Sequence, residues 1–306
     1  MLLRDFILSS RLSLSDLYGV EEAGALVSRL CEQLLGCSPY THIVEPEWSI
    51  PVEKEEELNK ALQRLLSHEP IQYVLGYADF MGMRLRVSPS VLIPRPETEE
   101  LCQRIIDAYA KLPQEKGPRR ILDLCCGSGC ISWAMAKAFP DAQVYAVDLS
   151  QEALALARSQ NVPGVNAPHF IQADVLDTDA LCSILPASLL QEPQVPQESP
   201  DSSLSFDLVI SNPPYVRDLE KAQMQENVLL YEPHLALFVP DDDPLRFYRK
   251  IASVFSKLGT DSSLCALEIN EKFAEEVKKI FDKNAYQACS ERDFRGKDRF
   301  VFAKKK

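Results

Sequence analysis

Four consecutive residues, Asn212-Pro213-Pro214-Tyr215, combine groups that suit the handling of a planar NH2 group. They follow an apolar run at 206–211 that is typical of a strand, and open parallel sheets bind ligands where their strands end. The Asn212 side-chain oxygen can accept a hydrogen bond, the prolines offer only carbonyl acceptors, and the tyrosine adds a flat face with a polar tip. This set suits methylation of an exocyclic or amide nitrogen. Asn-Pro-Pro alone is also a turn signal, so other residues must decide between a turn and a methylation site.

Three acidic residues lie at the ends of the three preceding predicted strands. Asp123 opens a glycine-rich turn with Gly127 and Gly129, where a ligand can approach backbone amides. Asp148 follows the second strand, where an acid can hold both hydroxyls of a ribose. Asp174 follows the third strand, where its side chain could contact the amino group of an adenine. Alternatively, the segment Asp148-Leu149-Ser150 could cap the next helix, and Asp174 could cap or terminate a strand, but the joint spacing favours a cofactor site.

Alternating strands and helices from residue 120 onward would position these residues. We expect seven strands and intervening helices, the strands being 121–124, 143–147, 169–173, 206–211, 263–269 and two near 285–289 and 298–303. Such alternation predicts an α/β fold with a mostly parallel sheet that is covered on both faces.

The earlier part of the chain has a different pattern. Amphipathic spacing predicts helices at 20–35 and 53–67, which need partners to bury their apolar stripes and so predict a small bundle. Alternation around Gly82 within 78–87 predicts a β-hairpin.

These patterns divide the chain into three predicted parts. We expect a helical domain at 1–75, a β-hairpin linker at 76–94 and the α/β domain at 95–306. Within the last of these, the segment 186–205 is rich in Pro, Gln and Ser, cannot build a core, and is predicted to be a loop or insertion without an assigned role.

Composition limits the classes of partner. The 306 residues carry a formal charge of −12, and the only run of cations is Lys304-Lys305-Lys306, so direct nucleic-acid binding is not expected. Nine cysteines without a Cys-x-x-Cys pair and four histidines argue against a metal site. The absence of a signal peptide and of a long apolar stretch predicts a cytoplasmic protein that does not enter a membrane. We also expect a monomer.

Together, these motifs resemble class I S-adenosylmethionine-dependent methyltransferases, and most closely the release-factor glutamine methyltransferases of the PrmC/HemK family. The resemblance covers most of the chain and includes segments 68–73, 91–99, 206–216, 231–233, 236–237 and 296–299. The block Pro94-Arg95-Pro96-Glu97-Thr98-Glu99 is highly specific beside Asn-Pro-Pro-Tyr. The chain departs from the family at Cys125 and Cys126, where a glycine and a threonine are usual. The change at Cys125 bears on how closely the methionine part of the cofactor packs, because Cys cannot take every backbone conformation that is open to Gly.

The resemblance implies a doubly wound seven-stranded sheet, a small N-terminal helical domain that docks the substrate, and S-adenosylmethionine as cofactor, with S-adenosylhomocysteine as product. It implies a cofactor site that consists of Asp123, Cys125, Cys126, Gly127, Ser128, Gly129, Asp148, Asp174, Val175 and Asn212. It also implies that the substrate is the glutamine of the Gly-Gly-Gln motif in peptide-chain release factors, held by Asn212, Pro213, Pro214, Tyr215 and Arg95.

In the mechanism that we expect, the Asn212 oxygen and the Pro213 carbonyl accept the two N–H bonds of the glutamine amide, and Tyr215 walls its plane. No metal or covalent intermediate is needed. Arg95 and Glu97 either shape the cleft between the domains or form a surface ion pair and a helix start.

Two other functions stay open. A nucleic-acid adenine N6-methyltransferase would use Asn-Pro-Pro-Tyr equally well, although the charge of −12 and the lack of a basic patch argue against it. A catalytically silent cofactor-binding scaffold is the other possibility, and Cys125 is the residue that keeps it open.

Overall fold

The computed structural model of the protein describes residues 1–111, 117–189 and 205–305. The chain forms two units, each with its own core. The first consists of Met1–Tyr77 together with Met224–Glu232, and the second of Ala78–Gln223 together with Pro233–Lys306. A short segment from late in the sequence therefore completes the N-terminal unit.

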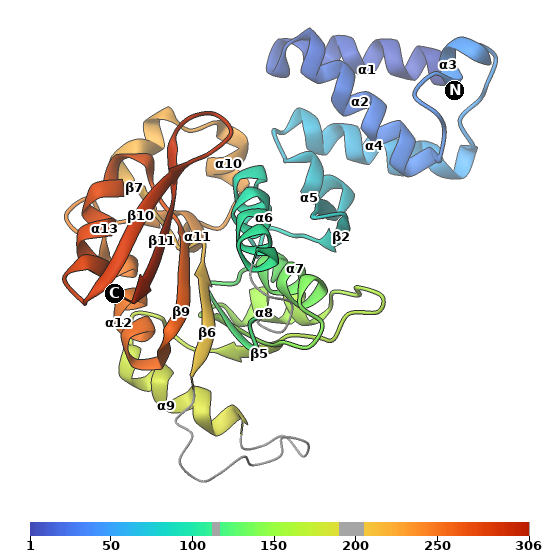
Figure 1. The fold of residues 1–306 in the computed structure, drawn as a ribbon. Helices are drawn as coiled ribbons and strands as arrows, with labels where there is room; N and C mark the ends of the chain where they lie inside the picture. The colour runs from blue at the N-terminus through green and yellow to red at the C-terminus, as the bar shows by residue number, and fades with distance from the viewer. Residues whose placement is uncertain (112–116, 190–204, 306) are drawn as a thin grey trace. The chain divides into compact units, whose positions relative to one another are not determined.

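The N-terminal unit is helical, as the apolar periodicity predicts. Gly36, at φ 67°, ends the second helix where the sequence places its stop. The Tyr231 hydroxyl donates a hydrogen bond to the Ser67 carbonyl at 2.6 Å, which attaches the late segment. The helices, all drawn in Figure 1, are α1 (Leu3–Tyr18), α2 (Val20–Leu35), α3 (Thr41–Val44), α4 (Val52–Leu66), α5 (Ile71–Leu75) and α10 (Glu226–Tyr231).

The second unit contains a seven-stranded sheet in the order β10-β11-β9-β6-β3-β4-β5 (Figure 1). Neighbouring strands are parallel except at β11, which is antiparallel to both β9 and β10. The predicted mostly parallel sheet is confirmed. Its strands are β3 (Arg120–Leu124), β4 (Gln143–Asp148), β5 (His169–Gln172), β6 (Phe206–Ser211), β9 (Gly259–Glu268), β10 (Tyr286–Arg292) and β11 (Asp298–Lys305).

Helices cover both faces of this sheet. Neighbouring residues of β3 belong to different cores: Ile121 packs in the cluster with α6 (Pro96–Ala110) and α7 (Cys130–Ala138), whereas Leu122 packs in the cluster with α12 (Arg246–Leu258) and α13 (Ala274–Asp282). Strands that are buried on both faces are rich in apolar residues, as residues 121–122 of β3 and 208–210 of β6 are.

Shorter elements complete the second unit. Strands β1 (Tyr77–Phe80) and β2 (Met83–Arg86) pair as the predicted hairpin, and Gly82 between them has φ 67°. The remaining elements are α8 (Gln151–Arg158), α9 (Thr178–Leu189), β7 (Val216–Arg217), η1 (Asp218–Gln223), α11 (His234–Leu237), β8 (Phe238–Val239) and η2 (Glu271–Phe273). No helix in the described ranges is long and apolar enough to cross a membrane.

One prediction is wrong in part. The segment 186–205 was expected to be a loop, but α9 continues through residues 186–189. Within these four residues Ala187 and Leu189 favour a helix whereas Pro186 does not, so composition alone could not show where the helix ends. Residues 190–204 lie outside the described part of the chain.

Candidate active site

A cavity of about 370 Å³ lies at the carboxyl ends of β3, β4, β5 and β6. This is the edge at which doubly wound sheets bind ligands, and the volume is within the range of small-molecule sites. Its lining includes predicted site residues from four successive strand ends, namely Cys125, Cys126, Gly127, Ser128, Asp148, Asp174, Val175, Asn212 and Pro214, and it also includes Arg95.

Four residues of the predicted site do not line this cavity. Asp123 is fully buried, and its carboxylate accepts a hydrogen bond from the Ser132 hydroxyl at 2.5 Å. Gly129 lies where a Cβ would come within 3.2 Å of Ala157, so its glycine serves close helix–strand packing. The other two, Pro213 and Tyr215, are turned toward the protein interior beside lining residues.

The sequence argument missed several parts of the lining. They are the loop 89–92 with Pro94, the first-turn residue Thr98, residues 149–150, the segment 233–236 and Phe247. The block around Arg95 and the segment 231–237 were recognised as motifs, but they lie far from the strand ends in sequence. Only the fold brings them to the cavity.

Asp148 holds the glycine-rich turn in place. One of its carboxylate oxygens accepts the Gly127 N–H at 2.8 Å, and the other accepts the Ser150 N–H at 2.9 Å. Burial raises the pKa of Asp148, and these backbone donors oppose that effect. The residue that caps α8 is Ser150, whose hydroxyl accepts the Ala153 N–H at 3.1 Å. The segment 148–150 therefore does cap α8, but through Ser150 and not through the Asp148 carboxylate.

Asp174 also forms a local turn, since its carboxylate accepts the Leu176 N–H at 2.8 Å. It is Asp177 that accepts an N–H in the first turn of α9, from Ala180 at 3.1 Å. Asp174 is thus free of a capping role and lines the cavity between β5 and α9.

The departure from the family at Cys125 has a structural consequence. Cys125 has φ 60°, in the left-handed region that glycine enters freely and other residues enter at a cost of about 1–2 kcal/mol. Burial raises the pKa of the Cys125 and Cys126 thiols, so both are neutral at ordinary pH. They act as small apolar groups in the wall of the cavity.

Replacing Cys125 by glycine should stabilise the protein by about 1 kcal/mol, because the left-handed strain disappears. Thermal unfolding with and without S-adenosylhomocysteine measures this. The matched control is Cys126→Gly, which removes a buried side chain without relieving a positive φ and should destabilise by about 1 kcal/mol or more. Equal destabilisation by both changes would contradict the strain argument.

The Asn-Pro-Pro-Tyr segment is anchored to two other elements. The Asn212 Nδ2 group donates to the Thr98 hydroxyl of α6 at 3.0 Å, and the Tyr215 hydroxyl donates to Glu268 of β9 at 2.8 Å. Thr98 in turn donates to the other Glu268 oxygen at 2.7 Å. The Tyr215 ring packs against the apolar core, so the structure gives it a supporting position behind the cavity.

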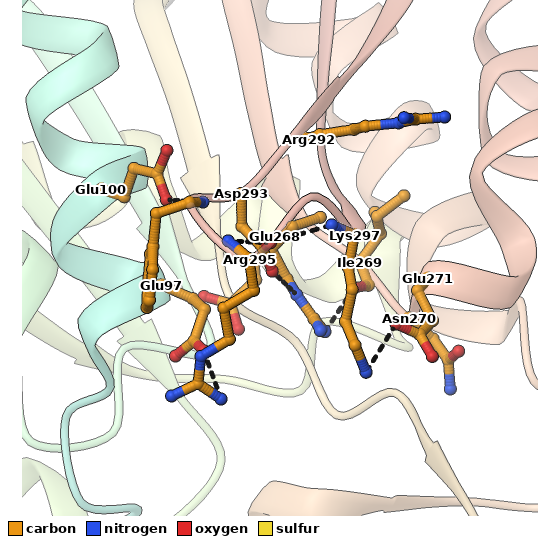
Figure 2. Close-up of polar contacts among 12 residues, drawn as sticks. Glu97, Glu100, Glu268, Ile269, Asn270, Glu271, Arg292, Asp293, Arg295 and Lys297 are labelled. Carbon is orange, nitrogen blue, oxygen red and sulfur yellow. Dashed lines mark hydrogen bonds and ion pairs between the residues drawn. The ribbon is translucent and has the colours of Figure 1, made fainter.

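The turn between β10 and β11 braces the same region. Asp293 accepts hydrogen bonds from the backbone N–H groups of Arg295 and Lys297, at 2.9 Å and 3.0 Å. Figure 2 shows Arg295 directed toward Glu97 and Lys297 directed toward Glu271, with separations of 3.6 Å and 3.0 Å. The turn therefore connects α6 with η2, which follows β9.

Arg95 and Glu97 lie in different surroundings. Arg95 is the residue before α6 and lines the cavity, whereas Glu97 lies in the first turn of α6 and pairs with Arg295. The ion-pair and helix-start reading holds for Glu97, and Arg95 remains a candidate for contact with substrate.

Known proteins resemble this chain over nearly its whole length. Residues 121–184 match the family described as Methyltransferase domain, and residues 9–76 match the PrmC N-terminal domain. Similar curated proteins, each named release factor glutamine methyltransferase, come from Bacteroides thetaiotaomicron (38% identity, 96% of both chains), Flavobacterium psychrophilum (39% identity, 78% of this chain and 77% of that one) and Streptococcus pneumoniae (38% identity, 76% and 73%).

The sheet order, the reversed strand β11 and the cavity across four strand ends define a class I methyltransferase. The identity and coverage of its relatives identify the chain further. It belongs to the family of release factor glutamine methyltransferases. The fold class and the family expected from the sequence are confirmed.

Proposed function

We propose that this protein methylates the side-chain amide nitrogen, N5, of the glutamine in the Gly-Gly-Gln motif of peptide-chain release factors, with S-adenosylmethionine as methyl donor. The observation that carries the proposal is the placement of Asn212 at the cavity, with its Nδ2 group bound internally by Thr98. The side-chain oxygen of Asn212 is therefore the group that can accept a hydrogen bond from an amide N–H of the substrate. The family to which the chain belongs supports glutamine as the substrate.

The cavity fits a nucleoside cofactor. The Asp148 carboxylate lies at the end of β4, where it can accept from ribose hydroxyls, and Asp174 lies at the end of the neighbouring strand. A Cβ on Gly127 would meet nothing within 4 Å, which leaves open space above the turn. Bound there, the cofactor would supply an electrophilic methyl group.

The chemistry required of the protein is orientation. An amide nitrogen is a poor nucleophile because its lone pair is shared with the carbonyl. We propose that the Asn212 Oδ1 atom and the Pro213 carbonyl accept the two N–H bonds, which concentrates electron density on nitrogen and fixes the direction of attack. The Pro213 carbonyl is bonded to the Pro214 nitrogen, and Pro214 lines the cavity. Orientation of this kind is worth several kcal/mol.

The helical N-terminal unit is proposed as the docking surface for the release factor. It supplies none of the residues that line the cavity, and it carries exposed apolar side chains on its helices, including Leu8, Leu12 and Ile43. We further propose that the enzyme acts as a cytoplasmic monomer. Retained methylation by a chain that lacks residues 1–75 would exclude the docking role.

Methyl transfer from labelled S-adenosylmethionine to a purified release factor tests the proposal. A release factor with its Gly-Gly-Gln glutamine replaced is the control, and we expect label on the unaltered factor alone. Equal labelling of both factors would exclude that glutamine as the site. Label on DNA or RNA, with none on the factor, would favour adenine methylation, and cofactor binding without any transfer would favour the silent scaffold.

A further inference from the structure

Glu268 is a buried carboxylate directly behind the proposed methyl-transfer site. It ends β9 and is 1% exposed. Its two oxygens accept hydrogen bonds from the Thr98 hydroxyl at 2.7 Å and the Tyr215 hydroxyl at 2.8 Å. Burial raises its pKa, whereas these two donors and the charge of Arg299 oppose that effect. In this arrangement both hydroxyls donate and the carboxylate of Glu268 accepts.

The hydrogen bond from Thr98 to Glu268 fixes the direction of the hydrogen bond between Thr98 and Asn212. A threonine hydroxyl has one hydrogen, and Thr98 uses it to donate a hydrogen bond to Glu268. Toward Asn212 it can therefore only accept, which requires the Nδ2 group of Asn212 to face it, at 3.0 Å. The Asn212 Oδ1 atom forms no hydrogen bond within the described residues and is left for the cavity that Asn212 lines.

Shape alone cannot choose this orientation. The oxygen and the NH2 group of an asparagine are nearly the same size, so the two flipped forms pack equally well and only hydrogen bonding distinguishes them. In the flipped form, an NH2 group would face the NH2 group of the substrate, donor against donor. The correct orientation is thus a property of the partners of Asn212.

We infer that Thr98 and Glu268 are positioning residues for methyl transfer, which hold the Asn212 amide with its oxygen toward the substrate nitrogen. The inference rests on the proposed function. It assigns a role to two residues that need not touch the reacting atoms. The turn between β10 and β11 contacts both α6, through Glu97 and Glu100, and Glu271, three residues after Glu268 (Figure 2).

The first test compares Thr98→Val with Thr98→Ser. Valine has the shape of threonine without its hydroxyl, whereas serine keeps the hydroxyl. We expect Thr98→Val to lower kcat about tenfold or more, with the KM for the release factor and the affinity for S-adenosylhomocysteine changed by less than about threefold. Thr98→Ser should restore kcat to within about threefold of the original protein. Thr98→Val with an unchanged kcat, or Thr98→Ser as impaired as Thr98→Val, would overturn the inference.

Glu268→Met provides a second test. Without the carboxylate, the Thr98 hydroxyl is released to donate to Asn212 Oδ1, which turns the amide the wrong way. We expect kcat to fall at least as far as in Thr98→Val while the cofactor still binds. Thermal unfolding confirms that each variant is folded at the assay temperature. Full activity of Glu268→Met would contradict the inference.

A measurement without substrate separates this inference from the proposed function. In ¹⁵N-labelled protein, the Asn212 side-chain NH2 signal is assigned by its loss in Asn212→Ala. Its hydrogens should exchange with solvent about tenfold more slowly in the original protein than in Thr98→Val, because one N–H is held by Thr98. Equal exchange rates would overturn the inference, whatever the methylation assay shows. Slow exchange together with unlabelled release factor would exclude only the proposed function.

Discussion

Asn212→Ala should lower kcat for release-factor methylation about a thousandfold. The change removes the side-chain oxygen that accepts an amide N–H, and loss of one such group in an active site costs about 3–4 kcal/mol of barrier. The affinity for S-adenosylhomocysteine should stay within about threefold, because the turn 125–128 and Asp148 remain in place. Single-turnover transfer of labelled methyl, beside calorimetric titration of the cofactor product, measures both quantities.

The control for this change is Asn161→Ala, which alters an exposed asparagine outside the cavity lining. It should leave both kcat and cofactor affinity unchanged. If Asn212→Ala retained more than about a tenth of the original kcat, orientation by its oxygen would not be the main source of catalysis. A parallel loss of cofactor affinity would instead assign Asn212 to cofactor binding.

Asp123 should make the protein less stable as the pH rises. It is fully buried, one of its oxygens has no hydrogen-bond partner among the described residues, and burial raises its pKa to about 7. Below pH ~4 the carboxyl is protonated in both the folded and the unfolded chain. Between about pH 4 and 7 only the unfolded chain ionises, so the unfolding free energy falls by up to about 4 kcal/mol. Above about pH 7 this loss is complete.

Urea denaturation of cofactor-free protein from pH 4.5 to 8 tests this against Asp123→Asn. The variant cannot ionise at this position, so the difference between the two unfolding free energies should change steadily up to about pH 7 and then level off. Asp107→Asn, which alters an exposed acid, should show no such difference. Because the comparison is of slopes, any constant cost of burying the asparagine cancels. Identical slopes for Asp123→Asn and the original protein would contradict the prediction.

The sequence was informative where chemistry and local structure coincide. Asn212 and Gly127 follow strands and Asp148 ends one, and a strand end is both a recognisable pattern and the place where such sheets bind ligands. The spacing of apolar residues likewise predicted the helices and the sheet, because burial on one or both faces of an element determines that spacing.

The support of the site could not be predicted in the same way. Thr98 and Glu268 are 170 residues apart in sequence, and neither belongs to a sequence pattern that predicts a hydrogen bond between them. Their pairing depends on how α6 packs beside β9, which is a result of tertiary structure. Tyr215 was expected to wall the plane of the substrate amide, but its ring packs inward and its hydroxyl donates to Glu268. Sequence adjacency gives no information on side-chain direction at the end of a strand.

The attachment of α10 to the N-terminal unit affects the order in which the chain can fold during synthesis. The Tyr231–Ser67 hydrogen bond joins residues 164 positions apart. While the ribosome is still translating strands β3 to β6, the five N-terminal helices are already synthesised, but the surface that α10 will cover is still exposed. That unit reaches its final composition only after residue 232 has left the exit tunnel. Such late, non-local contacts slow folding, and until they form the N-terminal unit is incomplete on the nascent chain.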